Sequence, residues 1–233
     1  MKIALFGYGK MGKMIEHLAE GRGHSIVAKV DVETTEIDYT NMDVAIDFSM
    51  PEAALKNIKG CIEAGVPIIS GTTGWLDNYD DAVAFCKEHE GAFLYASNFS
   101  LGVHVFFELN RYLAQIMSAL PEYKVSIDET HHTQKLDAPS GTAITLAEGI
   151  INASKYDTWS LNKNESGSVP IHSHRKGEVP GTHLVSYAGG IDEISIEHKA
   201  HNREGFALGA VIAAEWIHGK KGIFSMKDVL NLG

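Results

Sequence analysis

The chain has 233 residues, of which 44% are hydrophobic and 21% are charged, a balance typical of a globular protein with a buried core. Its 20 basic and 30 acidic side chains give a net charge of −10, which argues against a broad surface for nucleic acid or anionic lipid. Two cysteines, Cys61 and Cys86, are too few for a disulfide framework or a cysteine-based zinc site, so we expect small core residues. No signal peptide or membrane span is predicted, because no apolar run approaches about 18 residues, and we expect a cytoplasmic protein.

The first hundred residues alternate short apolar runs with longer amphipathic stretches. The apolar runs are continuous, as in strands that are buried on both faces of a parallel sheet. We predict strands at residues 2–6, 25–30, 42–48, 66–70 and 92–96. We predict helices between them at residues 11–20, 51–64 and 77–88. This βαβαβ order predicts an α/β fold with a Rossmann-type, doubly wound parallel sheet.

The pattern changes after about residue 100, where a long helix is predicted at 101–120. A half-exposed strand at 123–130, a helix at 142–151 and a polar stretch at 154–168 follow it. Further strands are predicted at 169–174, 183–188 and 193–198. An apolar helix at 204–218 could pack back onto the first domain. We therefore expect a dinucleotide-binding domain of residues 1–100, completed by 204–233, and an α+β domain of residues 101–203 with a mixed or antiparallel sheet.

A glycine-rich loop, Gly7-Tyr8-Gly9-Lys10-Met11-Gly12, follows the first predicted strand and opens the first helix. This spacing allows a tight turn, a close approach of backbone to a pyrophosphate, and close packing of helix on strand. Asp31 ends the second strand 19 residues after Gly12, where an acid can accept hydrogen bonds from a ribose. Asp31 would repel a 2′-phosphate and Val32 offers no cation, so we expect NADH to be preferred, while Lys10 and Lys29 keep NADPH use open.

A second loop of small residues, Gly71-Thr72-Thr73-Gly74, follows the fourth predicted strand. Ligands bind beyond the carboxyl ends of the strands in such sheets, so this loop is expected to face the cofactor. The alternative is an ordinary turn.

The densest group of reactive residues runs from Glu129 to Ala143, between a strand and a helix. A zinc site is not favoured, because adjacent histidines on a strand, here His131 and His132, point to opposite faces. An acid–base site is favoured, since an imidazole and the nearby Lys135 supply proton donors near neutral pH. The Ser-Gly-Thr run at 140–142 opens a helix whose unpaired N–H groups suit a carboxylate.

A third cluster, residues 172–183, concentrates histidines, glycines and two cations. Arg175 could form a bidentate pair with a carboxylate of a ligand, and His172 and His174 could line the same anionic pocket. The alternative is a solvated strand and turn.

Together these motifs resemble the 4-hydroxy-tetrahydrodipicolinate reductase (dihydrodipicolinate reductase) family of lysine biosynthesis, nearly from end to end. The resemblance rests on the segments 7–12, 47–53, 71–74, 97–103, 131–143 and 175–183. The run His-His, Lys, Asp-Ala-Pro-Ser-Gly-Thr-Ala within 131–143 is the most specific of them.

The resemblance implies a role for each matching residue. His131 and Lys135 would be catalytic, and His132, Gly141, Thr142 and Arg175 would bind substrate, with no metal. The cofactor-binding residues would be Gly7, Tyr8, Gly9, Lys10, Met11, Gly12, Asp31, Gly71, Thr72, Thr73, Ala96, Ser97, Asn98 and Phe99. The family's basic residue after the acid, here after Asp31, is replaced by Val32. The resemblance also implies a homotetramer that assembles through the sheet of the second domain.

The implied activity is reduction of a cyclic imine dicarboxylate by NADH, with NADPH as a second cofactor. Two alternatives stay open. One is a related NAD(P)-dependent reductase of another imine or amino acid, and the other is a protein that binds NADH as a sensor without turnover.

Overall fold

A computed structural model describes residues 1–232, which form two units. Unit 1 contains residues 1–101 and the segment from Glu204 onward, and unit 2 contains residues 102–203. The roles expected for the two domains, and their exact limits, stay predictions. No helix in the described part of the chain is both long and apolar enough to cross a membrane.

Unit 1 is built on a six-stranded sheet in the order β11-β5-β4-β3-β1-β2, with every neighbouring pair parallel. The strands are β1 (Lys2–Phe6), β2 (Ser25–Val30), β3 (Val44–Asp47), β4 (Ile68–Ser70), β5 (Ala92–Tyr95) and β11 (Gly222–Phe224). The helices are α1 (Lys10–Gly21), α2 (Pro51–Glu63), α3 (Tyr79–Glu88) after the short η1 (Leu76–Asn78), α6 (Glu204–Ile217) and α7 (Met226–Leu230). The predicted Rossmann-type parallel sheet is confirmed.

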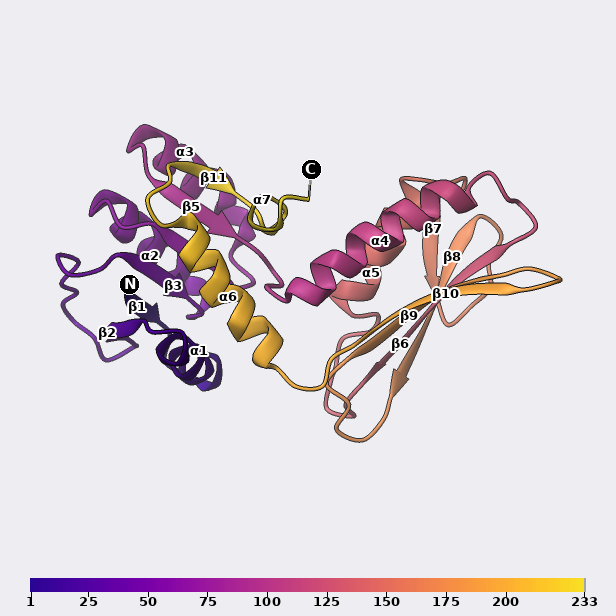
Figure 1. Ribbon diagram of the computed structural model, residues 1–233, viewed down its shortest axis with the longest axis horizontal. Helices are drawn as coiled ribbons and strands as arrows, with labels where there is room; N and C mark the ends of the chain where they lie inside the picture. The colour runs from indigo at the N-terminus through magenta and orange to yellow at the C-terminus, as the bar shows by residue number, and fades with distance from the viewer. Residues whose placement is uncertain (233) are drawn as a thin grey trace. The chain divides into compact units, whose positions relative to one another are not determined.

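Helices cover both faces of this sheet, as the continuous apolar strands predict. Ile3 and Leu5 of β1 enter a core shared with α1 and α6, whereas Ala4 and Phe6 enter a second core shared with α2 and α3. Cys61 and Cys86 are unpaired and buried in this second core, as expected. In Figure 1, α6, drawn in yellow, runs along the same side of the sheet as α1.

Unit 2 is built on a five-stranded mixed sheet in the order β10-β9-β6-β8-β7. β6 (Lys124–His131), β8 (Ser168–Arg175) and β7 (Thr158–Leu161) are parallel, while β9 (Thr182–Ala188) is antiparallel to both β6 and β10 (Glu193–Lys199). Helices α4 (Leu101–Met117) and α5 (Gly141–Ile151) pack on one face of this sheet (Figure 1). The mixed sheet of the second domain is therefore confirmed.

Three elements differ from the sequence prediction. β7 lies in the stretch expected to be polar and irregular, and β11 and α7 were not expected. All three are short, and each strand pairs along only one edge, with β8 or with β5. The two strands are stabilised by that pairing, which a periodicity in the sequence does not encode, and α7 begins at a capping box of Ser225 and Asp228.

A close backbone contact fixes α6 to the loop after β5. A Cβ atom at Gly209 would lie 1.7 Å from the carbonyl oxygen of Phe99, so only glycine allows this approach. Gly21, at the end of α1, has no atom within 4 Å of the corresponding position.

We expect Gly209→Ala to lower the free energy of unfolding by about 3 kcal/mol, because the helix must move away from Phe99. The matched change Gly21→Ala should leave stability unchanged or raise it by up to about 1 kcal/mol. Urea unfolding followed by circular dichroism checks both. A Gly209→Ala variant as stable as the original chain would contradict this packing.

Candidate active site

The predicted cofactor-binding residues of unit 1 follow the carboxyl ends of parallel strands. The loop Gly7–Gly12 follows β1, Asp31 follows β2, residues 71–73 follow β4 and residues 96–99 follow β5. Phe48 follows β3, and its ring lies 5.7 Å from the ring of Phe99. The structure therefore brings these residues to one edge of the sheet.

The glycines of these loops are needed for close packing. A Cβ at Gly7, whose φ is +89°, would lie 2.1 Å from the carbonyl oxygen of Phe48, and a Cβ at Gly12 would lie 2.4 Å from that of Gly7. A Cβ at Gly71 would lie 2.3 Å from the ring of Phe48. In contrast, nothing lies within 4 Å of the Cβ position of Gly9, and no side chain caps α1 there. The start of α1 thus offers free backbone N–H groups beside open space, as an anion requires.

A buried carboxylate holds the loops after β3 and β4 together. Asp47, fully buried, accepts hydrogen bonds from Ser49 Oγ at 2.6 Å, Asn57 Nδ2 at 3.1 Å, Ser70 Oγ at 2.8 Å and Thr72 Oγ1 at 2.7 Å. The backbone N–H of Ser49 also donates to Thr72 Oγ1 at 2.9 Å. The Thr72 hydroxyl therefore shapes the loop, a role that the sequence did not indicate.

Asp31 and Lys29, near this edge, have defined partners. Asp31 Oδ1 accepts from the Glu33 N–H at 3.0 Å and from the Thr34 hydroxyl at 3.2 Å. Lys29 Nζ lies 2.7 Å from Glu16 Oε1 and donates to Tyr8 at 3.0 Å, and the pKa of Lys29 is raised, chiefly by Glu16 and then by Tyr8. The charge of Lys29 is thus compensated.

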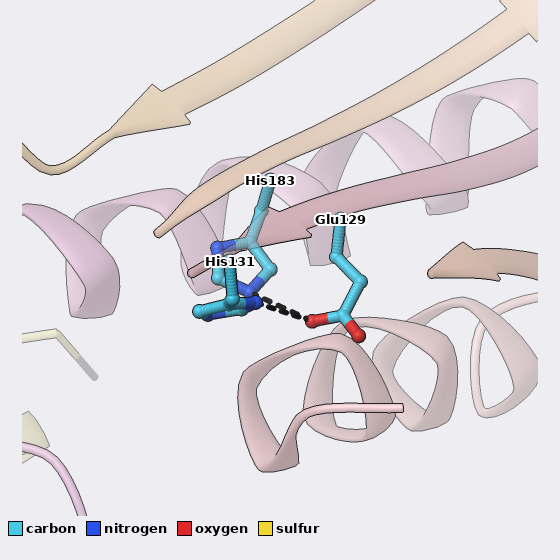
Figure 2. Close-up of side chains that lie close together, drawn as sticks. All are labelled: Glu129, His131 and His183. Carbon is cyan, nitrogen blue, oxygen red and sulfur yellow. Dashed lines mark ion pairs between the residues drawn. The ribbon is translucent and has the colours of Figure 1, made fainter. Parts of the chain in front are cut away.

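In unit 2 the strand register gathers the reactive residues. Along β6, alternate residues face α4 and α5, which places Glu129 and His131 on the same buried face. Across the sheet, Glu129 lies opposite His183 of β9 and beside Ser173 of β8. Figure 2 shows the side chains of Glu129, His131 and His183 pointing toward one another.

Glu129 is fully buried and lies at the centre of this group. Its Oε1 accepts from the Ser140 backbone N–H at 3.1 Å, Ser173 Oγ at 2.7 Å and Arg175 Nη2 at 3.2 Å. His131 Nδ1 lies 2.9 Å from the other oxygen, Oε2. Burial opposes ionisation of Glu129, yet contacts from His131, Ser140 and Ser173 hold its pKa below its usual range. Glu129 is therefore a charged carboxylate inside the protein.

His183 is a buried neutral imidazole beside Glu129. Burial, and then the nearby His131, lowers the pKa of His183 to about 3. Its Nε2 lies 3.1 Å from Ser140 Oγ and 3.9 Å from Glu129 Oε2, one of the two contacts drawn as dashed lines in Figure 2. Because His183 is neutral near pH 7, this longer contact does not offset the charge of Glu129.

Arg175 lies next to the site, but its donors are largely used inside the protein. Besides Glu129, its guanidinium donates to the carbonyl oxygens of Lys135 at 3.3 Å, Asp137 at 2.6 Å and His174 at 2.8 Å. Arg175 thus holds the loop after β6, and its predicted contact with a substrate carboxylate stays a prediction. His174 Nε2 lies 2.9 Å from Asp128 Oδ1, on the face of the sheet opposite to Glu129. His174 therefore does not join Arg175 in the group around Glu129.

The remaining predicted residues lie at the loop after β6 and at the start of α5. Lys135 Nζ contacts both carboxylate oxygens of the exposed Asp137 at 2.8 Å. Ser140 caps α5 by accepting the Ala143 N–H at 3.2 Å, which leaves Gly141 and Thr142 in its open first turn. His132 follows the end of β6 and is half-buried.

No individual role was expected for Glu129 or Ser173, and Ser140 was expected only as part of the run that opens a helix. The alternation Val125, Ile127, Glu129, His131 was the available signal, because it places an acid where every other side chain is buried.

The potential ligand atoms of Glu129, His131 and His183 lie within 4.8 Å of one another, as in a metal site. From the sequence only His131 and His132 were candidate ligands, and this grouping was not expected. However, the guanidinium of Arg175 on Glu129 would repel a divalent cation, and 2.9 Å between Nδ1 and Oε2 is the distance of a shared proton. The absence of a metal stays a prediction, and the geometry favours an acid–base group.

Comparisons with known proteins cover nearly the whole chain. Family models described as the N-terminus and the C-terminus of dihydrodipicolinate reductase match residues 1–99 and 102–230. The 4-hydroxy-tetrahydrodipicolinate reductase of Christiangramia forsetii is 54% identical, covering 99% of this chain and 98% of its own. The enzyme of that name from Neisseria meningitidis serogroup B is 37% identical over 82% of this chain and 73% of its own.

A solved structure shares the fold. It is a dipicolinate-bound dihydrodipicolinate reductase from Paenisporosarcina sp. TG-14, with a TM-score of 0.76, 22% identity and 97% coverage of both chains. The resemblance inferred from the motifs is confirmed: the chain belongs to the dihydrodipicolinate reductase family and is an oxidoreductase.

Proposed function

We propose that this protein reduces 4-hydroxy-tetrahydrodipicolinate, by way of dihydrodipicolinate, to tetrahydrodipicolinate in the synthesis of diaminopimelate and lysine. The observation that carries the proposal is the intact acid–base group around His131 in a chain 54% identical to an enzyme of that name. Unit 1 would bind the cofactor, and unit 2 would bind the substrate.

The residues of unit 1 fit a nicotinamide dinucleotide. The uncapped start of α1 at Gly9 would hold the pyrophosphate, and Asp31 the adenosine ribose. The loops 71–73 and 96–99 would border the nicotinamide. When bound, this cofactor supplies a hydride, which the ring carbon conjugated with the substrate imine accepts.

The start of α5 and the loop after β6 would hold the dicarboxylate. The first-turn N–H groups of Gly141 and Thr142 would bind one carboxylate of the substrate. The Lys135 ammonium would bind the other carboxylate and would give up its contact with Asp137. His132 would contact the substrate ring, and Arg175, with one N–H left, would contribute from the edge of the site.

His131 and Lys135 would supply the proton. Hydride addition places an electron pair on the imine nitrogen and the adjacent carbon, and a neighbouring cation stabilises that charge until a proton arrives. One hydride and one proton together account for the two hydrogens gained by the ring.

The assay for this function mixes the purified protein, NADH and enzymatically generated 4-hydroxy-tetrahydrodipicolinate and follows NADH absorbance. We expect NADH oxidation that depends on this substrate, and His131→Ala or Lys135→Ala should lower kcat by about 10²–10⁴-fold while NADH binding persists. Lys163→Ala is the matched control, because Lys163 also contacts an acid two residues later but is exposed and distant in sequence.

Several outcomes would contradict the assignment. NADH binding without oxidation would favour a sensor, oxidation only with other imines would favour a related reductase, and unchanged kcat in both variants would remove His131 and Lys135 from the mechanism.

NADH is the cofactor that we expect this chain to prefer. Asp31 would repel a 2′-phosphate, Val32 is 91% exposed and uncharged, and Lys29 is held by Glu16. Wild-type kcat/KM should therefore be higher for NADH than for NADPH. Val32→Arg should raise kcat/KM for NADPH about tenfold, because the guanidinium could form one charge-assisted hydrogen bond to the 2′-phosphate. The matched change Val32→Leu adds no charge and should not raise it. A wild-type preference for NADPH would refute this argument.

Self-association as a homotetramer through unit 2 is also part of the proposal. The sheet of unit 2 is the expected assembly surface: on its described part, Ile194 of the edge strand β10 is 42% exposed, and Ile191, between β9 and β10, is 99% exposed. Such surfaces are commonly covered by a partner. Sedimentation velocity should give a particle of four chains, and Ile194→Glu should shift it toward smaller species; a monomeric wild-type protein would refute this assembly.

A further inference from the structure

We propose that Glu129 is a positioning residue for His131: its Oε2 keeps a proton on Nδ1, so that Nε2 is the nitrogen that exchanges a proton with substrate. This inference rests on the proposed function, because it concerns the acid of that reaction. Glu129 does not touch substrate in this scheme and acts only through His131.

The two oxygens of Glu129 have different surroundings. Oε1 accepts three hydrogen bonds, from Ser140, Ser173 and Arg175. These donors fix the plane of the carboxylate and satisfy Oε1. Oε2 accepts none of them and faces the two imidazoles.

Burial makes the pairing of Oε2 with His131 necessary. Oε2, His131 Nδ1 and His183 Nδ1 are buried, and none makes a well-aligned hydrogen bond within the described chain, so the contact of 2.9 Å between Nδ1 and Oε2 is the shortest that Oε2 has to a possible donor. A buried charged oxygen without a donor costs free energy, and an ionised carboxylate can only accept. His183 is neutral and 3.9 Å away, so the donor at 2.9 Å is the Nδ1–H of His131.

The opposite nitrogen of His131 faces Gly181. A Cβ at Gly181 would lie 3.1 Å from His131 Nε2 and 3.4 Å from its Cδ2, so a side chain at this position would crowd this edge of the ring. Nδ1 thus faces the buried carboxylate, while Nε2 lies beside a residue without a side chain.

The proton inventory of this arrangement balances. The doubly protonated ring breaks its Nε2–H bond as that hydrogen bonds to the substrate, and the bonding electron pair stays on Nε2. The ring ends as the neutral Nδ1–H form with its contact to Oε2 unchanged, so no second proton has to move. A fixed carboxylate orients the histidine of a Ser-His-Asp triad by the same physical means.

The decisive variant is Glu129→Gln. The three donors on Oε1 require the amide oxygen at that position, which places the amide NH₂ where Oε2 was, facing His131 Nδ1. Nδ1 must then accept, and the neutral ring should carry its proton on Nε2. The expected kinetic result is a loss of about 10²–10⁴-fold in kcat with an unchanged KM for NADH.

The tautomer itself is read from solid-state ¹⁵N spectra of histidine-labelled protein, with the His131 signals assigned by His131→Gln. We expect Nδ1–H in the wild type and Nε2–H in Glu129→Gln. The matched control is Asp128→Asn, the same change at the neighbouring position of β6, where the carboxylate contacts the exposed His174 at 2.9 Å. This control should keep both the His131 spectrum and kcat.

Three results would overturn the proposal: a wild-type neutral His131 that carries its proton on Nε2, a Glu129→Gln variant with wild-type kcat, or one that loses NADH binding together with kcat. The wild-type spectrum needs neither a folded variant nor substrate. It therefore tests the Glu129–His131 pair even if the protein proves inactive on 4-hydroxy-tetrahydrodipicolinate, a result that would reject the proposed function instead.

Discussion

Each unit contains a fully buried carboxylate, and several segments that carry candidate site residues are fixed to it. A buried charge is tolerated only where donors surround it, so the donors must be brought to that point by the fold. Asp47 collects hydroxyl and amide donors from β4, from α2 and from the loops after β3 and β4, and Glu129 collects donors from β6, from β8 and from the residue that caps α5. Removing either acid would leave several loops without their common acceptor.

The sequence was sufficient for features that depend on local pattern. The continuous apolar strands predicted the parallel sheet, and the glycine spacing predicted the uncapped start of α1, because both signals lie within a few residues. The role of Glu129 could not be read in this way, since it depends on the register that places β9 and β8 on either side of β6. Arg175 illustrates the same limit: its charge was evident, but the carbonyl oxygens that occupy it come from a loop about 40 residues away.

The net charge of −10 says little about the chemistry of an anionic ligand, because what counts is where single cations lie, and three cations near the candidate sites have acidic partners. Lys29 contacts Glu16, Lys135 contacts Asp137 and Arg175 contacts Glu129. These pairs differ in burial, since Glu129 is inaccessible whereas Asp137 is 62% exposed. Water can take the place of Lys135 on Asp137 at little cost, so of these three cations Lys135 is the one that a ligand could recruit most easily.

Ser140 connects two parts of the candidate site, the start of α5 and the group around Glu129. Its hydroxyl caps α5 and contacts His183, and its backbone N–H holds Glu129. The first-turn N–H groups of α5 and the ring of His131 are therefore separated by a nearly rigid distance. In the proposed function such a spacing would select ligands by length: a molecule whose carboxylate and proton-accepting atom lie closer together or farther apart could not reach both ends, whatever its charge.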